Sequence, residues 1–272
     1  MKKSFSQQSL PMVVGSVKHK NANDVIAEIL KAEADGAKAF TVTIQLLQAA
    51  YHTFESYKSI AGATDYPVMG INYRTNGGPD DEQRIEMLRE AVRAGFRSVD
   101  IPAYSYDYDT QSSLSLCTLP FASAYPKEIS MRPQVIAKQK ELIKEFKEMG
   151  AEVLMSAHVG VELSLEQAVS LALEMQSRGA DIVKIITDCK SEEKQLEILQ
   201  TNLALKKLLS VPFVYTCSGK YSHFIRYNAP LFGTMLVFAN QAYGELSVKE
   251  MPLIHEVAAY LSQYSGKNDR GA

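Results

Sequence analysis

The sequence predicts an α/β protein with the (β/α)8 TIM-barrel fold, built as a single domain. Eight short apolar runs alternate with segments of helical periodicity along the 272 residues. Most of these runs are apolar on both faces, as in parallel strands that are covered by helices on each side. Barrels of this kind commonly reach this length as one domain. We therefore expect one barrel over residues 1–265, because strands and helices in this order assemble naturally into it.

The predicted strands are short runs rich in β-branched and aromatic residues. The sixth run, DIVKII, carries a lysine among its apolar residues. In chain order, the eight strands are expected at residues 11–17, 38–46, 66–73, 96–101, 152–157, 182–186, 211–216 and 232–239.

The predicted helices have apolar residues at helical spacing and recognisable ends. Asn21 or Asn23 could cap the first helix, and Gly36 ends it. The SLEQ that begins at Ser164 resembles a capping box. The helices are expected at residues 21–35, 51–61, 79–94, 129–149, 164–178, 191–209 and 247–262.

Two segments fall outside the alternation of strands and helices. Residues 102–127 are rich in Tyr, Ser, Asp and Thr without a clear period, so we expect a long loop insertion. Its tyrosines could supply hydroxyl contacts to a ligand, or the segment could be an ordinary surface loop or a dimer contact. The tail, residues 266–272, is expected to be disordered.

The composition excludes several classes of partner. The net charge of −2, a pI of about 6.2 and the absence of a basic run argue against nucleic acid and anionic membranes. The three cysteines form no CxxC or Cys/His pattern, so we expect neither disulfides nor a zinc site, and no other metal or cofactor. Without a signal peptide or a membrane-spanning run, a cytoplasmic location is expected.

Lys184, in the sixth predicted strand, is the residue that most strongly suggests chemistry. A buried ammonium must pair, reach water or lose its proton, and a neutral lysine can attack a carbonyl to form a Schiff base. The structural alternative is a strand-end lysine whose stem packs while its head reaches solvent. For an isolated lysine, the structural alternative is favoured.

The barrel places further polar residues beside Lys184, because active sites of barrels lie at the carboxyl ends of the strands. A histidine on the neighbouring strand could move a proton in carbonyl chemistry, and two arginines suit an anionic substrate. The polar residues expected at these ends are Thr41, Thr43, Gln45, Asn72, Arg74, Asp100, His158, Lys184, Arg226 and Glu245.

Two stretches resemble the catalytic motifs of type I 3-dehydroquinate dehydratases, a family of (β/α)8 barrels with a Schiff-base lysine and a catalytic histidine. The stretch MSAHVG at 155–160 is similar to the motif that ends in the histidine, which implies that role for His158. The stretch GADIVKI at 179–185 is similar to the lysine motif, which implies the Schiff-base role for Lys184.

Two more stretches resemble the substrate-binding motifs of the same family. The stretch NYRT at 72–75 implies a substrate-binding role for Arg74. The stretch IRYNAPLFGTMLVFA at 225–239 implies that Arg226 binds the substrate carboxylate. The resemblance covers most of the chain and also implies the shikimate pathway of aromatic amino acid biosynthesis and a homodimer.

The sequence departs from the family pattern around the expected ligand. The charged Glu-x-Arg-x-Asp of strand two is replaced by Thr41, Thr43 and Gln45, and the Gln that follows strand eight is replaced by Glu245. Asp100 is retained and is expected to orient His158. Each lost charge-assisted hydrogen bond is worth roughly 1.5–3 kcal/mol, so the family's substrate would bind poorly unless other contacts compensate.

The residues therefore favour a Schiff-base dehydratase, a carbon–oxygen lyase that removes water from a small, carboxylate-bearing β-hydroxy ketone. In this hypothesis Lys184 attacks the ketone, His158 moves protons, and Arg226 binds the carboxylate with support from Arg74. The alternatives are a Schiff-base aldolase or isomerase, and a non-catalytic or regulatory binder of an anionic metabolite. Retention of Lys184 and His158 favours the enzyme, since binding alone requires neither.

Overall fold

The computed structural model describes residues 2–75, 78–108 and 128–265, and confirms the single-domain (β/α)8 barrel. Its strands are parallel neighbours in the order β7-β6-β5-β4-β3-β2-β1-β8. Between the two end strands, the Met235 N–H donates to the Phe213 carbonyl at 2.9 Å, so the barrel is nearly closed. The strands are β1 (Met12–Val17), β2 (Ala39–Thr43), β3 (Val68–Ile71), β4 (Ser98–Pro102), β5 (Glu152–His158), β6 (Ile182–Asp188), β7 (Phe213–Ser218) and β8 (Leu236–Ala239).

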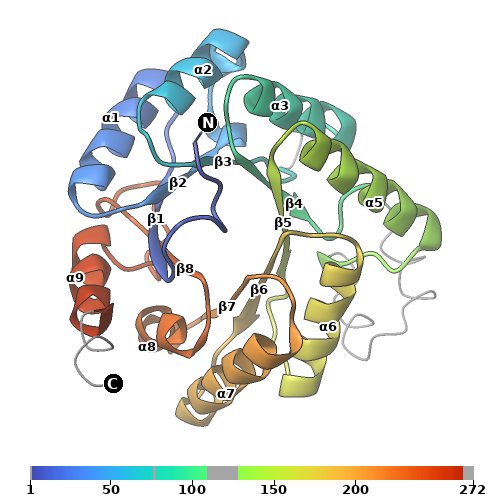
Figure 1. Cartoon of the computed structure of the whole chain (residues 1–272), viewed down its shortest axis with the longest axis vertical. Helices are drawn as coiled ribbons and strands as arrows, with labels where there is room; N and C mark the ends of the chain where they lie inside the picture. Colours follow the sequence, from blue (N-terminus) through green and yellow to red (C-terminus); the bar gives the residue numbers. More distant parts are fainter. Residues whose placement is uncertain (1, 76–77, 109–127, 266–272) are drawn as a thin grey trace.

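The helices lie around the outside of the barrel, as Figure 1 shows. Asn21, not Asn23, caps the first helix, because its side chain accepts from the Asp24 N–H at 2.9 Å. The predicted capping box is present, with Ser164 and Gln167 each accepting from the other's backbone N–H. The helices are α1 (Ala22–Ala34), α2 (Phe54–Gly62), α3 (Asp81–Arg93), α5 (Pro133–Glu148), α6 (Leu165–Ser177), α7 (Glu192–Leu208), α8 (Ser222–Asn228) and α9 (Ile254–Ser265).

The structure corrects the prediction for residues 232–239. The segment before β8 forms the short helix α8 and a 3-10 turn, Ala229–Phe232, so the strand begins only at Leu236. A seven-residue helix is too short to leave a clear period in the sequence.

The predicted start of the last helix at residue 247 is also wrong, because α9 begins at Ile254. Pro252 cannot donate a helical hydrogen bond, and its carbonyl accepts from the Asn240 N–H at 2.8 Å. The preceding residues therefore form a loop against the end of β8, and Val248, Glu250 and Met251 line a cavity there.

Apolar side chains close the end of the barrel at which the strands begin. Phe5 is fully buried in a cluster with Met12, Leu154 and Val214, which come from β1, β5 and β7. The N-terminal segment crosses this end of the barrel (Figure 1), and the Ser6 N–H donates at 3.1 Å to Glu152, the first residue of β5. The cavity therefore opens at the opposite end, where the strands finish.

Parts of the remaining predictions fall on residues that the structure does not describe. The predicted insertion at 102–127 is described as far as Tyr108, and the predicted disordered tail at 266–272 lies outside the described residues. Within the described ranges, no helix has the length and apolar character needed to cross a membrane.

Candidate active site

A cavity of about 400 Å³ lies at the carboxyl ends of the strands. Five predicted site residues line it together, and they come from β2, β5, β6 and α8: Thr41, Thr43, His158, Lys184 and Arg226. The barrel thus brings together side chains that are far apart in the sequence. Three others do not line it: Asp100 lies beneath Lys184, and Arg74 and Glu245 point elsewhere.

Lys184 lies on β6 with only 5% of its surface exposed. Its Nζ donates to Asp100 Oδ2 at 3.1 Å and to Tyr73 Oη at 3.0 Å. The Phe238 ring lies 4.9 Å away, from Nζ to the ring centroid. The cost of burying this ammonium is offset by the pairing with Asp100, and the face of the aromatic ring adds a cation–π contact.

We expected Asp100 to orient His158, but its hydrogen bonds go to other residues. Among the described residues its hydrogen-bond partners are Lys184, the Tyr73 hydroxyl, which donates to Oδ2 at 2.6 Å, and the Ser156 hydroxyl, which donates to Oδ1. The register explains this, because Ser156 lies directly opposite Lys184 on the neighbouring strand β5. Asp100 therefore holds the lysine rather than the histidine.

Tyr73 is a cavity residue that the sequence analysis missed. Burial, together with the nearby Asp100 carboxylate, raises the pKa of its phenol well above the usual value, so the hydroxyl keeps its proton. Its ring meets the imidazole of His158 edge to face, with 5.4 Å between centroids. Tyr73 therefore contacts Lys184, Asp100 and His158 at once.

Strand parity is the signal that would have found Tyr73. Side chains alternate between the two faces of a strand, so Met69, Ile71 and Tyr73 share one side. Met69 belongs to the barrel interior, and Ile71 and Tyr73 line the cavity. By the same alternation, the side chain of Arg74 points away from the barrel interior. The prediction for Arg74 did not take this alternation into account.

His158 is the last residue of β5 and lines the cavity. Burial, with the positive charges of Lys184 and Arg226 nearby, lowers the pKa of its imidazole to about 3. Its backbone N–H donates to the Glu128 carboxylate at 3.1 Å, which ties the end of β5 to the segment before α5. The imidazole is therefore neutral near pH 7, with one ring nitrogen that carries no proton.

Arg226 comes from α8, the short helix that the sequence did not predict. Its side chain is 5% exposed, and burial lowers the pKa of the guanidinium. Nη2 lies 3.8 Å from Glu250 Oε2, and within the described ranges Nε has no hydrogen-bond partner. A buried guanidinium in the wall of a cavity suits an anionic ligand.

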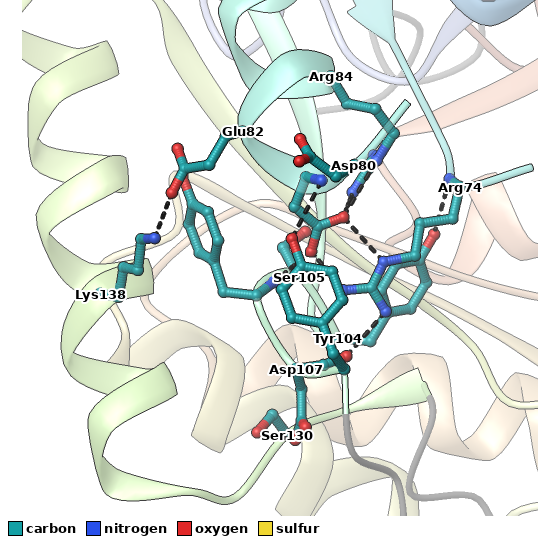
Figure 2. Close-up of polar contacts among 12 residues, drawn as sticks. Arg74, Asp80, Glu82, Arg84, Tyr104, Ser105, Asp107, Ser130 and Lys138 are labelled. Carbon is teal, nitrogen blue, oxygen red and sulfur yellow. Dashed lines mark hydrogen bonds and ion pairs between the residues drawn. The ribbon is translucent and has the colours of Figure 1, made fainter. Parts of the chain in front are cut away.

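Arg74 lies outside the cavity, in a network with α3 and the segment after β4 (Figure 2). It donates from Nε to Asp81 Oδ1 at 2.8 Å and from Nη1 to the Asp107 carbonyl at 2.8 Å. The rings of Tyr104 and Tyr108 lie 4.8 and 4.7 Å from its guanidinium carbon. The structure thus does not bring Arg74 to the predicted ligand, and its donors serve the fold instead.

Asp81 is the centre of this network. Its buried carboxylate accepts from Arg74, from Arg84 and from the Tyr106 N–H. Burial alone would raise the pKa of this carboxyl, but the hydrogen bonds from the two arginines outweigh it and lower the pKa. The network ties the segment that follows β4 to the first turn of α3.

Asp81→Asn is expected to lower the free energy of unfolding by about 3–5 kcal/mol, because it leaves the buried Arg84 without its counter-charge. Urea unfolding followed by circular dichroism measures this loss. The matched control is Glu82→Gln, whose exposed ion pair with Lys138 should contribute less than about 1 kcal/mol. Equal losses in the two variants would contradict a structural role for the Asp81 network.

Glu245 is exposed and lines a second, smaller cavity of about 230 Å³ next to the first. The acidic side chain that reaches the main cavity is instead Glu250, five residues later in the loop before α9. Thr41, Thr43 and Gln45 form a neutral wall of the main cavity, and Gln45 Oε1 lacks a partner among the described residues. Lys18, which the sequence analysis also missed, lines both cavities.

No metal centre is evident in the part of the chain that the structure describes, where no group of three or more His, Cys, Asp or Glu side chains is suitably placed. The polar side chains that line the cavity carry amine, imidazole, phenol, guanidinium, hydroxyl, amide and carboxylate groups.

The fold and the cavity define a class: a (β/α)8 barrel with a buried lysine, a neutral histidine and a buried arginine at the carboxyl ends of its strands. The sequence model of the type I 3-dehydroquinase family matches residues 123–262, more than half of the chain. The protein belongs to this family, as a divergent member. A lyase-type, dehydratase-like activity is the one that this membership supports.

Solved structures of similar fold include dehydratases and an aldolase. The 3-dehydroquinate dehydratase from Geobacillus kaustophilus HTA426 has a TM-score of 0.74 at 16% identity, over 97% of this chain and 99% of that one. The type I enzyme from Clostridium difficile, solved with covalently modified comenic acid, has a TM-score of 0.72 at 16% identity, over 97% and 98%. An aldolase, QR15, has a TM-score of 0.54 at 15% identity, over 93% and 95%. At such identities the similarity concerns the fold, and no curated protein sequence matches the chain.

Proposed function

We propose that the protein is a Schiff-base-forming dehydratase that removes water from a carboxylate-bearing β-hydroxy ketone. The observation that carries this proposal is the position of Lys184 Nζ, held by Asp100 and Tyr73 at the cavity that His158 also lines. Family membership supports 3-dehydroquinate as the first substrate to test.

Lys184 would act as the nucleophile. Its amine adds to the ketone carbon, and loss of one water gives an iminium whose positive charge acidifies the neighbouring C–H. Asp100 lies against Nζ and can accept the proton that the ammonium must release before attack. Asp100 can then return that proton to the carbinolamine oxygen, which leaves as water, while the Tyr73 hydroxyl donates to Asp100 and holds the carboxyl group beside the reacting atoms.

His158 would move the protons of the elimination. Its neutral imidazole can accept the α-proton, and the C–H electrons form the new double bond as the β-hydroxyl departs. The same imidazole then returns its proton to the leaving oxygen, so that water is released. Hydrolysis of the iminium consumes one water and restores the lysine, and the net reaction is loss of one water.

Arg226 would bind the carboxylate of the substrate. Its guanidinium is buried at the cavity wall and has an unused Nε donor among the described contacts. A carboxylate in the cavity would pair with this guanidinium, which fixes the ring or chain of the ketone relative to Lys184. Arg74 has no part in this proposal, because its donors bind Asp81 and Asp107.

The neutral wall of Thr41, Thr43 and Gln45 favours a substrate that differs from 3-dehydroquinate or binds in another way. Threonine hydroxyls and an amide can exchange hydrogen bonds with hydroxyl groups but cannot form ion pairs.

The same wall supports the second candidate, a non-catalytic binder of an anionic metabolite. A Schiff-base aldolase or isomerase would use the same lysine. Placement in the shikimate pathway, a cytoplasmic location and a homodimer extend the proposal by family resemblance.

Borohydride trapping tests the function. The protein is incubated with 3-dehydroquinate, and separately with a panel of other keto acids, then reduced with borohydride and weighed by mass spectrometry. We expect a stable adduct with at least one ketone, and peptide mapping should place it on Lys184. Exposed Lys190, at the same end of the barrel, is the internal control and should stay unmodified. If no keto acid gives an adduct, the binder becomes the better explanation.

A further inference from the structure

Lys18 follows the last residue of β1 and reaches the junction of the two cavities. It lines the main cavity of about 400 Å³ and the second cavity of about 230 Å³, and it is half-buried. Ser16 is the other residue that both cavities share. Neither the family motifs nor the mechanism above uses this lysine.

The Lys18 ammonium has no hydrogen bond or ion pair with any residue in the described ranges. The charges near it are Lys184 and Arg226, of the same sign, and Glu28, of the opposite sign. Glu28 is already paired with His19. Burial, together with the like charge of Lys184, lowers the pKa of Lys18, so an anion placed beside it would relieve both effects.

The charges of the two cavities decide on which side such an anion would lie. The second cavity is lined by Glu28, which is paired with His19, and by exposed Glu245, so apart from Lys18 it offers an anion no further lysine or arginine from the described residues. The main cavity is lined by two further cations, Lys184 and Arg226, and by one carboxylate, Glu250, which lies 3.8 Å from Arg226 Nη2. The wall formed by Thr41, Thr43 and Gln45 carries no charge to compete for the anion.

We propose that Lys18 is the second cation of the carboxylate site, so that the substrate carboxylate lies between the Lys18 ammonium and the Arg226 guanidinium. Lys18 then determines specificity for keto acids over uncharged ketones. That the ligand is a ketone rests on the proposed function. The anion site itself depends only on the residues around it. A carboxylate flanked by two cations gains charge-assisted hydrogen bonds from both sides.

The test uses quinate, a ring carboxylate without a ketone, and its methyl ester as the uncharged match. Isothermal titration calorimetry measures both ligands with the wild type, Lys18→Met, Lys18→Arg and Arg226→Lys. We expect the wild type to prefer the acid, and Lys18→Met to bind the acid about tenfold more weakly or worse while binding the ester unchanged. Lys18→Arg should retain most of the preference. The control is Lys20→Met, which changes an exposed lysine two residues from Lys18. It should bind the acid and the ester as the wild type does.

A double variant shows whether both cations act on one carboxylate. If they share it, the combined loss in Lys18→Met with Arg226→Lys is smaller than the product of the two single losses. The proposal is overturned if the wild type has no preference for the acid, if Lys18→Met keeps it, or if that variant weakens acid and ester equally. Because quinate has no ketone, this result is independent of whether borohydride traps an adduct on Lys184.

Discussion

Lys184→Met is expected to lower turnover of the ketone substrate on the order of 10⁵-fold, as loss of a covalent nucleophile does elsewhere. Methionine keeps most of the side-chain volume at this buried position but cannot form an iminium. Asp100 retains the hydrogen bonds from Tyr73 and Ser156, so the barrel should still fold. Circular dichroism should match the wild type, and borohydride should leave no adduct.

The control for this variant is Lys190→Ala, which removes an exposed lysine at the same end of the barrel. Its ammonium lies 3.5 Å from Asp188 in an exposed ion pair, so turnover should stay within about twofold of the wild type. Turnover by Lys184→Met near the wild-type rate would rule out the covalent mechanism. Circular dichroism of Lys184→Met separates loss of folded structure from loss of chemistry, because a folded but inactive variant keeps the wild-type spectrum.

His158→Asn is expected to lower kcat by about 10²–10⁴-fold, the usual contribution of a positioned acid–base group. The amine of Lys184 is intact in this variant, so the iminium should form and then accumulate because its α-proton is not removed. Single-turnover kinetics combined with borohydride trapping measure the accumulation. A larger trapped fraction than in the wild type is the expected result.

His223 provides the matched control, because it is exposed on α8 and its ring packs on Tyr227 with 4.9 Å between centroids. His223→Asn should leave both kcat and the trapped fraction unchanged. If His158→Asn lowered the trapped fraction and kcat together, the histidine would serve iminium formation rather than the elimination. The role of proton carrier would then have to move to Tyr73 or Asp100.

The local pattern of apolar and polar residues was sufficient to predict the barrel architecture. The eight apolar runs and the helices between them each depend on neighbours in the chain, and signals such as Ser164 with Gln167 act within one turn. Where the pattern was weak, the prediction was wrong: α8 has seven residues, and the loop at 247–253 resembles a helix until Pro252 is taken into account. Asn240 pairs with this loop, a contact that no local periodicity reports.

Residue types and family motifs also located Lys184, His158 and Arg226 correctly at one cavity, although their roles stay predictions. The sequence motif NYRT drew attention to Arg74, whereas the residue that reaches the lysine is Tyr73, one position earlier. A shift of one residue on a strand moves a side chain to the opposite face, so a motif without strand parity cannot decide between them.

The sequence by itself thus determined the order of the eight strands and of the helices other than α8, and it identified Lys184, His158 and Arg226 as site residues. Only the tertiary structure decided their partners, because these depend on how distant strands align. Lys184 meets Asp100 and Tyr73 from 84 and 111 residues away, and Lys18 lines the same cavity as Arg226. Pairing between groups so far apart follows from barrel closure and register, which no local pattern encodes.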